Sequence, residues 1–244
     1  MPSLYPQEQK RLDFLCHLEE LRRRILFSLC AVLIAGIFSF LRYDLILSVV
    51  KAPIAGMVPS LIFLGPTEVF TAIVKICFIS GIILASPFIL YQFWAFISPA
   101  IDHNIRGRAV IWCIAAFFLL LVGVAFSYFI AIPAALKFLL NFGNDIATPQ
   151  ITLEKYLSFF TALLVAGGII FEIPIIIGFL ADMKLINSRL LSEKRPFIVI
   201  IFLILAAFLT PTQDIFNMLV IAVPMIILYE IGVILTFLIE RHRK

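Results

Sequence analysis

An acidic residue in an otherwise apolar stretch is the feature of the sequence most able to do chemistry. Residues 156–180 are long enough to cross a bilayer core of ~30 Å, and Glu172 interrupts them two places before Pro174. A carboxylate inside such a span costs roughly 2.5–3.5 kcal/mol on insertion scales, so it needs a partner, a proton or water. Two interpretations stay open. Glu172 is either a structural acid bonded to a neighbouring helix or part of the wall of a polar cavity in the membrane.

Two further groups of charged residues could bind or carry a ligand. Glu230 interrupts the last apolar run and, together with Glu172, could form a path for protons or cations. It also lies near enough to the inner end of that run to reach the membrane surface. Glu19 and Glu20 lie among the basic residues 22–24, where acids are not needed to set topology. They could bind a basic ligand, although helix capping and surface ion pairs explain such acids about as often.

The motifs of the common enzyme and metal sites do not occur in the sequence. It holds no GxSxG, no HExxH and no phosphate-binding glycine loop, and no nucleophile–base pair can be named. The histidines at 17, 103 and 242 do not cluster, so we expect no metal ion. We therefore predict a protein that is not an enzyme, has no cofactor and binds no nucleic acid.

The composition indicates a polytopic membrane protein. Hydrophobic residues make up 63% of the 244 residues and charged residues 14%, against about half and a quarter in soluble domains. We predict an all-α fold with one membrane domain over residues 1–244. The apolar runs predict six transmembrane helices, at about residues 25–41, 69–97, 109–132, 156–180, 196–209 and 215–239.

Three segments depart from a plain membrane span. Residues 1–24 are predicted to be a cytoplasmic segment whose leucines recur every three residues, which is typical of an amphipathic helix on the membrane surface. Residues 196–209 would rise only about 21 Å as a helix, which is short of the ~30 Å core. The run from 215 to 229, before Glu230, is about as short, so we expect short fifth and sixth helices.

The distribution of Lys and Arg predicts the orientation. The N-terminal segment has five, the 2–3 loop two, the 4–5 loop four and the C-terminus three, which makes 14 on one side against four on the other. By the positive-inside rule, both termini lie in the cytoplasm.

Sequence motifs along nearly the whole chain resemble those of the TatC family, the multi-spanning core of the twin-arginine protein translocase. They include HLEELRRRI at 17–25, GPTEVF at 65–70, SPFILYQFWAFISPA at 86–100, FEIP at 171–174, LTPTQD at 209–214 and AVPMIILYEIG at 222–232. The resemblance implies a cytoplasmic surface that binds twin-arginine signal peptides and a concave membrane face with a buried glutamate. It also implies TatA-like and TatB-like single-span partners, transport of folded proteins driven by the proton-motive force, and a homo-oligomer within a larger complex. The expected location is a bacterial inner membrane, with an organellar membrane as the alternative.

The resemblance also implies roles for particular residues. The residues implied for signal-peptide binding are His17, Glu20, Arg22, Phe96 and Asp102. Glu172 and Glu230 match intramembrane positions, and Pro53, Tyr128 and Asp214 match further motif positions.

Two departures from the family pattern concern these roles. Relatives usually have His-Glu-Arg-Arg in the first cytoplasmic loop, whereas this chain has Asp102-His-Asn-Ile-Arg, so the second signal-binding acid is missing or displaced to Asp102. Asn217 stands where relatives often have Gln.

The alternative function is a proton-coupled small-solute transporter that uses Glu172 and Glu230. Solute uptake by vesicles containing this protein alone would favour it.

Overall fold

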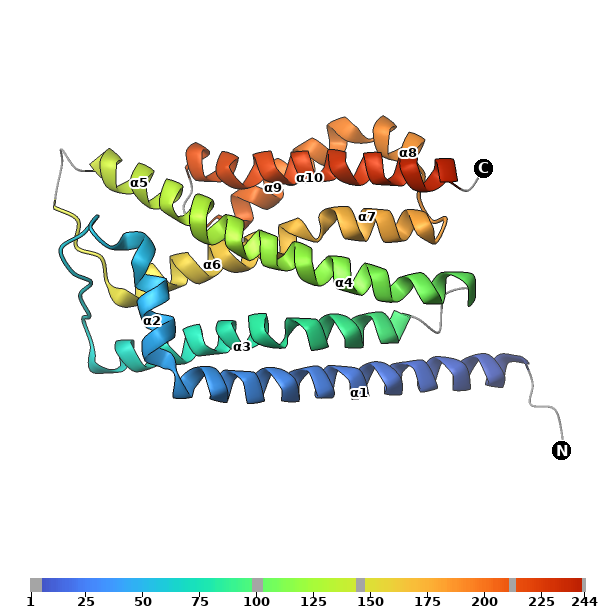
Figure 1. The fold of residues 1–244 in the computed structure, drawn as a ribbon, viewed down its shortest axis with the longest axis horizontal. Helices are drawn as coiled ribbons and strands as arrows, with labels where there is room; N and C mark the ends of the chain where they lie inside the picture. The colour runs from blue at the N-terminus through green and yellow to red at the C-terminus, as the bar shows by residue number, and fades with distance from the viewer. Residues whose placement is uncertain (1–5, 98–102, 144–147, 211–213, 243–244) are drawn as a thin grey trace.

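The computed structural model describes residues 6–97, 103–143, 148–210 and 214–242, and almost all of these are helical. The helices in chain order are α1 Pro6–Leu41, α2 Tyr43–Lys51, α3 Pro66–Ile97, α4 His103–Phe126, α5 Ile132–Gly143, α6 Leu153–Phe171, α7 Ile173–Asp182, α8 Ser188–Glu193, α9 Arg195–Leu209 and α10 Ile215–His242 (Figure 1). A 3-10 turn, Ala52–Ile54, follows α2, and a π-helical segment, Ser127–Ala131, joins α4 to α5.

The structure confirms an all-helical membrane protein with five long apolar spans and one shorter one. The long spans are α1 from Leu15, α3, α4–α5 together, α6–α7 together and α10. The shorter one, α9, has 15 residues and rises about 22 Å, so the prediction of a short fifth helix is confirmed. Helices suit the hydrocarbon core because their backbone N–H and C=O groups bond within the same segment.

The prediction of a short sixth helix is wrong. α10 is continuous over 28 residues, and Glu230 does not interrupt it. Glu favours the helix, so the backbone continues through Glu230, and the carboxylate is paired because Arg195 Nη2 lies 2.8 Å from Glu230 Oε2. The apolar run ends at Glu230 in the sequence, where its partner, 35 residues away along the chain, cannot be recognised.

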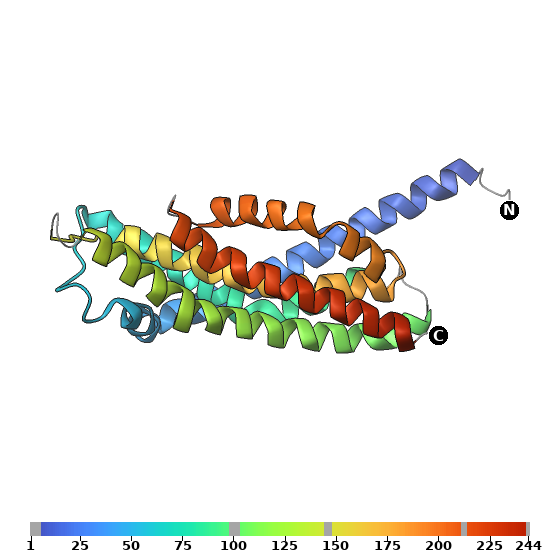
Figure 2. The same ribbon diagram turned by 90° about the horizontal axis from the view of Figure 1, so that it is seen from above.

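The N-terminal segment also differs from the expected amphipathic helix on the membrane surface. α1 is one helix of 36 residues, without a break between the charged segment and the first span. Its first turns extend beyond the ends of the other helices (Figure 2). Good helix-forming residues (Leu, Glu, Arg) fill the junction, and no Pro or Gly separates residues 15–30 into two elements. The charged segment therefore continues the direction of the first span.

The α6–α7 segment forms the centre of the bundle. In its most apolar stretch 61% of the residues are buried, against 11% in α1. The buried core around it includes Val50, Ile76, Ile132, Tyr156, Leu157, Phe160, Leu163, Ile170 and Ile221. The helix breaks at Glu172, where Pro174 lacks the N–H that would continue the hydrogen-bond ladder. Residues 156–180, which the sequence predicts as one span, therefore consist of two helices that meet at Glu172.

The ends of the helices gather into two groups. The first turn of α1 and the last turn of α10 lie at the same end of the molecule (Figures 1 and 2). α2 lies at the opposite end, and the start of α10 stops short of the level that α3 and α5 reach there. The short α9 accounts for this offset.

Close backbone contact joins α1 to α3. A Cβ atom added to Gly81 would lie 2.7 Å from the backbone nitrogen of Gly36 and 3.0 Å from the carbonyl oxygen of Val32. Small residues allow such approach in membranes, where dispersion contacts rather than the hydrophobic effect hold helices together. The α1–α3 pair positions the groove described below.

We expect Gly81→Ala to separate α1 from α3, because the added methyl group meets backbone that cannot rotate away. Overpacking of this kind costs about 1–3 kcal/mol of stability. Thermal unfolding of the purified protein should show a lower midpoint for Gly81→Ala. Gly65→Ala is the matched control, since a Cβ atom there has nothing within 4 Å. Equal midpoints for the two variants would contradict the close packing.

Candidate functional site

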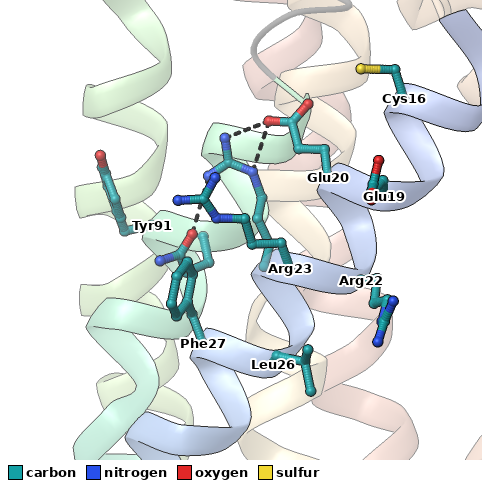
Figure 3. A pocket seen from close by; sticks show the side chains of 10 residues that line it. Cys16, Glu19, Glu20, Arg22, Arg23, Leu26, Phe27 and Tyr91 are labelled. Carbon is teal, nitrogen blue, oxygen red and sulfur yellow. Dashed lines mark hydrogen bonds and ion pairs between the residues drawn. The ribbon is translucent and has the colours of Figure 1, made fainter.

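A groove of about 880 Å³ lies between α1 and α3 near the end of the molecule that holds the first turns of α1 (Figures 1 and 3). Its lining is rich in charge for a protein with so few charged residues. It consists of Cys16, Glu19, Glu20, Arg22, Arg23, Arg24, Leu26, Phe27, Tyr91 and Gln92. All but the last two belong to α1, so one helix face supplies most of the groove.

Glu20 and Gln92 together hold a guanidinium group inside this groove. Glu20 Oε1 accepts hydrogen bonds from Arg24 Nε at 3.0 Å and Nη2 at 2.6 Å. Arg24 Nη1 donates to Gln92 Oε1 at 3.1 Å. Gln92 is only 8% exposed, so α3 presents this acceptor from a fixed position. Figure 3 shows these contacts as dashed lines beside α1. The site is therefore built for a planar cation with several donors.

The Glu20–Arg24 pair is weak enough to be exchanged. The side chains are 32% and 25% exposed, and they are four residues apart on one helix. Pairs of this kind contribute about 0.3–0.5 kcal/mol on helices and rarely more than ~1 kcal/mol when exposed. A second guanidinium with equal geometry could replace that of Arg24 at small cost.

The other residues implied for signal-peptide binding fall around this pair. His17 stacks on Phe96 with ring centroids 4.4 Å apart, and its Nδ1 lies 4.0 Å from Glu20 Oε2. Arg22 lines the groove but points away from the Glu20 carboxylate (Figure 3). Asp102 lies outside the described residues. The structure therefore brings His17, Glu20 and Phe96 together and leaves Arg22 on another part of the rim.

The two intramembrane acids have different surroundings. Glu172 lies at the break between α6 and α7, and its Oε1 is buried without a hydrogen-bond partner among the described residues. Glu230 is 40% exposed and is paired with Arg195. Within the described part of the chain, no hydrogen bond or ion pair links one acid to the other.

The remaining motif positions have structural contacts. Pro53 lies in the 3-10 turn after α2. The hydroxyl group of Tyr128 donates to the carbonyl oxygen of Val49 at 2.9 Å, which ties η3, the π-helical segment, to α2. Asp214 Oδ1 accepts from the backbone N–H of Asn217 at 2.7 Å, which caps the start of α10.

Two residues that were not singled out from the sequence hold parts of the structure together. Gln92 lies within the motif at 86–100, but nothing in the sequence pairs it with Arg24, which is 68 residues away. Glu68 accepts hydrogen bonds from the backbone N–H groups of Leu64 at 2.7 Å and Glu154 at 3.2 Å, so it joins the loop before α3 to the start of α6. The sequence signal that could have singled out Glu68 is its place in the motif at 65–70.

Among the described residues, no group of three or more His, Cys, Asp or Glu could hold a metal ion.

Comparison with known proteins gives one consistent family. The family model described as Sec-independent protein translocase protein (TatC) matches residues 16–224. The TatC protein of Carboxydothermus hydrogenoformans is 35% identical over 233 residues, which cover 96% of both chains. That of Aquifex aeolicus is 37% identical over 232 residues, covering 93% of this chain and 96% of the relative.

A solved structure has the same fold. The crystal structure of the twin arginine translocase receptor TatC superposes with a TM-score of 0.82 at 36% identity, covering 92% of this chain and 99% of that chain. Relatives of this kind are transport proteins, so the prediction that the chain is not an enzyme is confirmed. With matches over almost its whole length in sequence and in fold, the chain belongs to the TatC family of Sec-independent protein translocase proteins and is a multi-pass membrane protein.

Proposed function

We propose that this protein is the receptor for twin-arginine signal peptides in its translocase, with the groove between α1 and α3 as the binding site. The observation that carries the proposal is the guanidinium of Arg24 held by Glu20 and Gln92. A signal-peptide arginine offers the same planar set of donors, and charge-assisted bidentate bonds favour Arg over Lys. His17 and Phe96 form an aromatic wall beside the carboxylate. Arg22 and Asp102 are further candidate contacts.

The orientation belongs to the same proposal. The groove is accessible to signal peptides only if the first turns of α1 lie in the cytoplasm. The excess of Lys and Arg in the terminal segments and the 2–3 and 4–5 loops supports that orientation by the positive-inside rule. We place the protein in a bacterial inner membrane, with cargo movement driven by the proton-motive force. TatA-like and TatB-like single-span subunits and further copies of this chain are the proposed partners.

Glu20→Ala should weaken binding of a twin-arginine peptide by about tenfold or more, because a hydrogen bond to a charged group is worth about 1.5–3 kcal/mol. Arg24→Gln should strengthen binding by about twofold, because it removes the resident competitor at a cost of only ~0.5 kcal/mol. A peptide with Lys-Lys should bind the parent protein poorly.

These affinities can be measured with a fluorescent peptide and the purified protein in detergent. Glu19→Ala is the control, since Glu19 lines the same groove but does not contact the Arg24 guanidinium. The assignment of Glu20 fails if Glu20→Ala and Glu19→Ala bind the peptide equally.

Glu172 is proposed to meet a polar group of a TatA-like or TatB-like helix. A buried oxygen without a partner is rare in a stable protein, because buried polar groups nearly always bond. Ile169 and Ile176 lie three residues before and four after Glu172, and they are 60% and 54% exposed. This face of α6–α7 is therefore open beside the acid.

We expect Glu172→Gln to keep the fold and peptide binding, since the amide preserves hydrogen bonding, and Glu172→Ala to weaken docking of a partner helix. Photocrosslinkers at positions 169 and 176 should capture a TatA-like or TatB-like subunit in membranes, and less of it in the Glu172→Ala background. A probe at Ile200, which is 55% exposed on α9, serves as the control. Crosslinks to lipid alone, with normal transport by Glu172→Ala, would make the residue structural.

The transporter alternative requires both intramembrane acids to exchange protons. The Arg195–Glu230 pair weakens it, because a paired carboxylate at the membrane surface is satisfied without a proton. The double variant Arg195→Gln/Glu230→Gln should keep stability within about 1 kcal/mol of the parent, whereas Glu230→Gln alone leaves Arg195 without its partner. Vesicles with the double variant should show the same proton permeability as the parent. Loss of a proton current in the double variant would favour the transporter.

A further inference from the structure

A second pocket lies where α7 and α10 end, apart from the peptide groove. Its volume is about 600 Å³, and it is lined by Ala181, Lys184, Ile186, Asn187, Phe237, Glu240 and Arg241. Two apolar spans end beside it, at Asp182 and Arg241, so it lies at the level where hydrocarbon gives way to headgroups. None of its residues lines the groove between α1 and α3.

The backbone holds a lysine in an unusual conformation at this pocket. Lys184 has φ 62°, and it is the one described residue other than glycine with a positive φ. Its N–H donates to the carbonyl oxygen of Ala181, and the N–H of Leu185 donates to that of Leu180, both at 3.0 Å. This pattern is the helix C-terminal motif in which glycine usually takes the position of Lys184. A lysine in this backbone conformation costs conformational energy that a glycine would not. A role for its ammonium group explains why lysine occupies the position.

The acid of the pocket is already engaged, whereas its two cations have no acidic partner in the part of the chain that the structure describes. Both carboxylate oxygens of Glu240 accept hydrogen bonds from Ser188, one from the backbone N–H at 2.9 Å and one from the hydroxyl group. Neither Lys184 nor Arg241 forms an ion pair with another described residue. Asn187 Oδ1 accepts from the N–H of Leu190 at 2.7 Å, which leaves its amide nitrogen as a donor. The unengaged polar groups are thus cations and donors, which suit an anion.

The rest of the lining is apolar, and part of it is exposed on the surface of a membrane span. Phe237 is 56% exposed on α10, and Ile186 adds a second apolar wall. Close packing of α7 on α10 fixes this arrangement, because a Cβ atom on Gly232 would lie 2.9 Å from Ile177 Cδ1. Cations at the membrane surface beside an apolar wall match a phosphate headgroup with attached acyl chains.

We propose that this pocket binds the phosphate headgroup of an anionic phospholipid. Lys184 and Arg241 neutralise the phosphate, the Asn187 amide donates to it, and an acyl chain lies along Phe237. The proposal does not depend on peptide binding, since the pocket and the groove share no residue.

Native mass spectrometry of the full-length protein in detergent tests the proposal, with phosphatidylglycerol and phosphatidylcholine of equal acyl chains as probes. Each cation near an anionic surface contributes measurably, so we expect Lys184→Gly/Arg241→Gln to lose about tenfold or more in affinity for phosphatidylglycerol. Its affinity for phosphatidylcholine should not change. Arg189→Gln/Lys194→Gln is the matched control, because it removes the same charge nearby without touching the pocket. Equal phosphatidylglycerol affinity in all three proteins would overturn the proposal.

Single variants separate lipid binding from a purely structural role of Lys184. Lys184→Gly should raise the unfolding temperature without lipid, because glycine favours a positive φ, and should lower phosphatidylglycerol affinity. Lys184→Arg should keep that affinity. If Lys184→Gly raises the unfolding temperature and binds phosphatidylglycerol normally, the lysine is only a helix cap and the proposal fails. Displacement of phosphatidylglycerol by millimolar inorganic phosphate would identify an anion site rather than a lipid site, and would also overturn it.

Discussion

The burial of a broken helix at the centre of the bundle is the constraint on which the rest of the structure depends. A helix that breaks inside the membrane leaves backbone carbonyl groups without their usual donors, and lipid cannot supply them. The α6–α7 segment tolerates its break at Glu172 because most of its residues are covered by other helices. α3, α4 and α10 all pack against this segment, and Gly123 of α4 and Gly232 of α10 allow these two helices to approach it closely. Glu172 therefore lies at a break that other helices cover, away from most of the lipid.

Weak ion pairs position the charged side chains at the end of the molecule that holds the first turn of α1 and the last turn of α10, which we call the basic end. Glu20–Arg24 and Arg189–Glu193 are pairs four residues apart, and Arg195–Glu230 joins two neighbouring helices. Each pair contributes little to stability because water still reaches it. Weak pairs position side chains while leaving them exchangeable, which is what a surface that binds and releases a charged ligand requires. The groove on α1–α3 and the pocket on α7–α10 share no lining residue, and Figure 1 shows these two helix pairs on different sides of the bundle, so both sites can be occupied together.

The sequence predicts those elements that depend on residues close together in the chain. It does not predict contacts between residues that lie far apart in the chain. Hydropathy is a local property, so the spans and the short α9 could be predicted. Glu230 shortens the uninterrupted apolar run in the sequence, but its partner Arg195 comes from another helix, so the sequence alone does not show that the carboxylate is paired. The motifs at 17–25 and 86–100 contain Glu20 and Gln92, but neither motif shows that the two side chains hold one guanidinium between them. Distant partners of this kind become visible only when the helices are packed.

The unequal lengths of α9 and α10 have a consequence for the membrane around them. α10 is long enough to span, yet its first residue does not reach the level of the helix ends of α3 and α5 (Figures 1 and 2). Thr210 after α9 and Asp214 before α10 form polar contacts, and neither group belongs in hydrocarbon. Phe208, two residues before Thr210, is 84% exposed. Polar groups below the usual membrane surface beside an exposed aromatic residue require either a locally thinner bilayer or another protein against α9. Either arrangement lowers the free-energy barrier for polar groups to enter the membrane beside α9. This edge of the protein lies away from the end that holds the first turn of α1 (Figures 1 and 2).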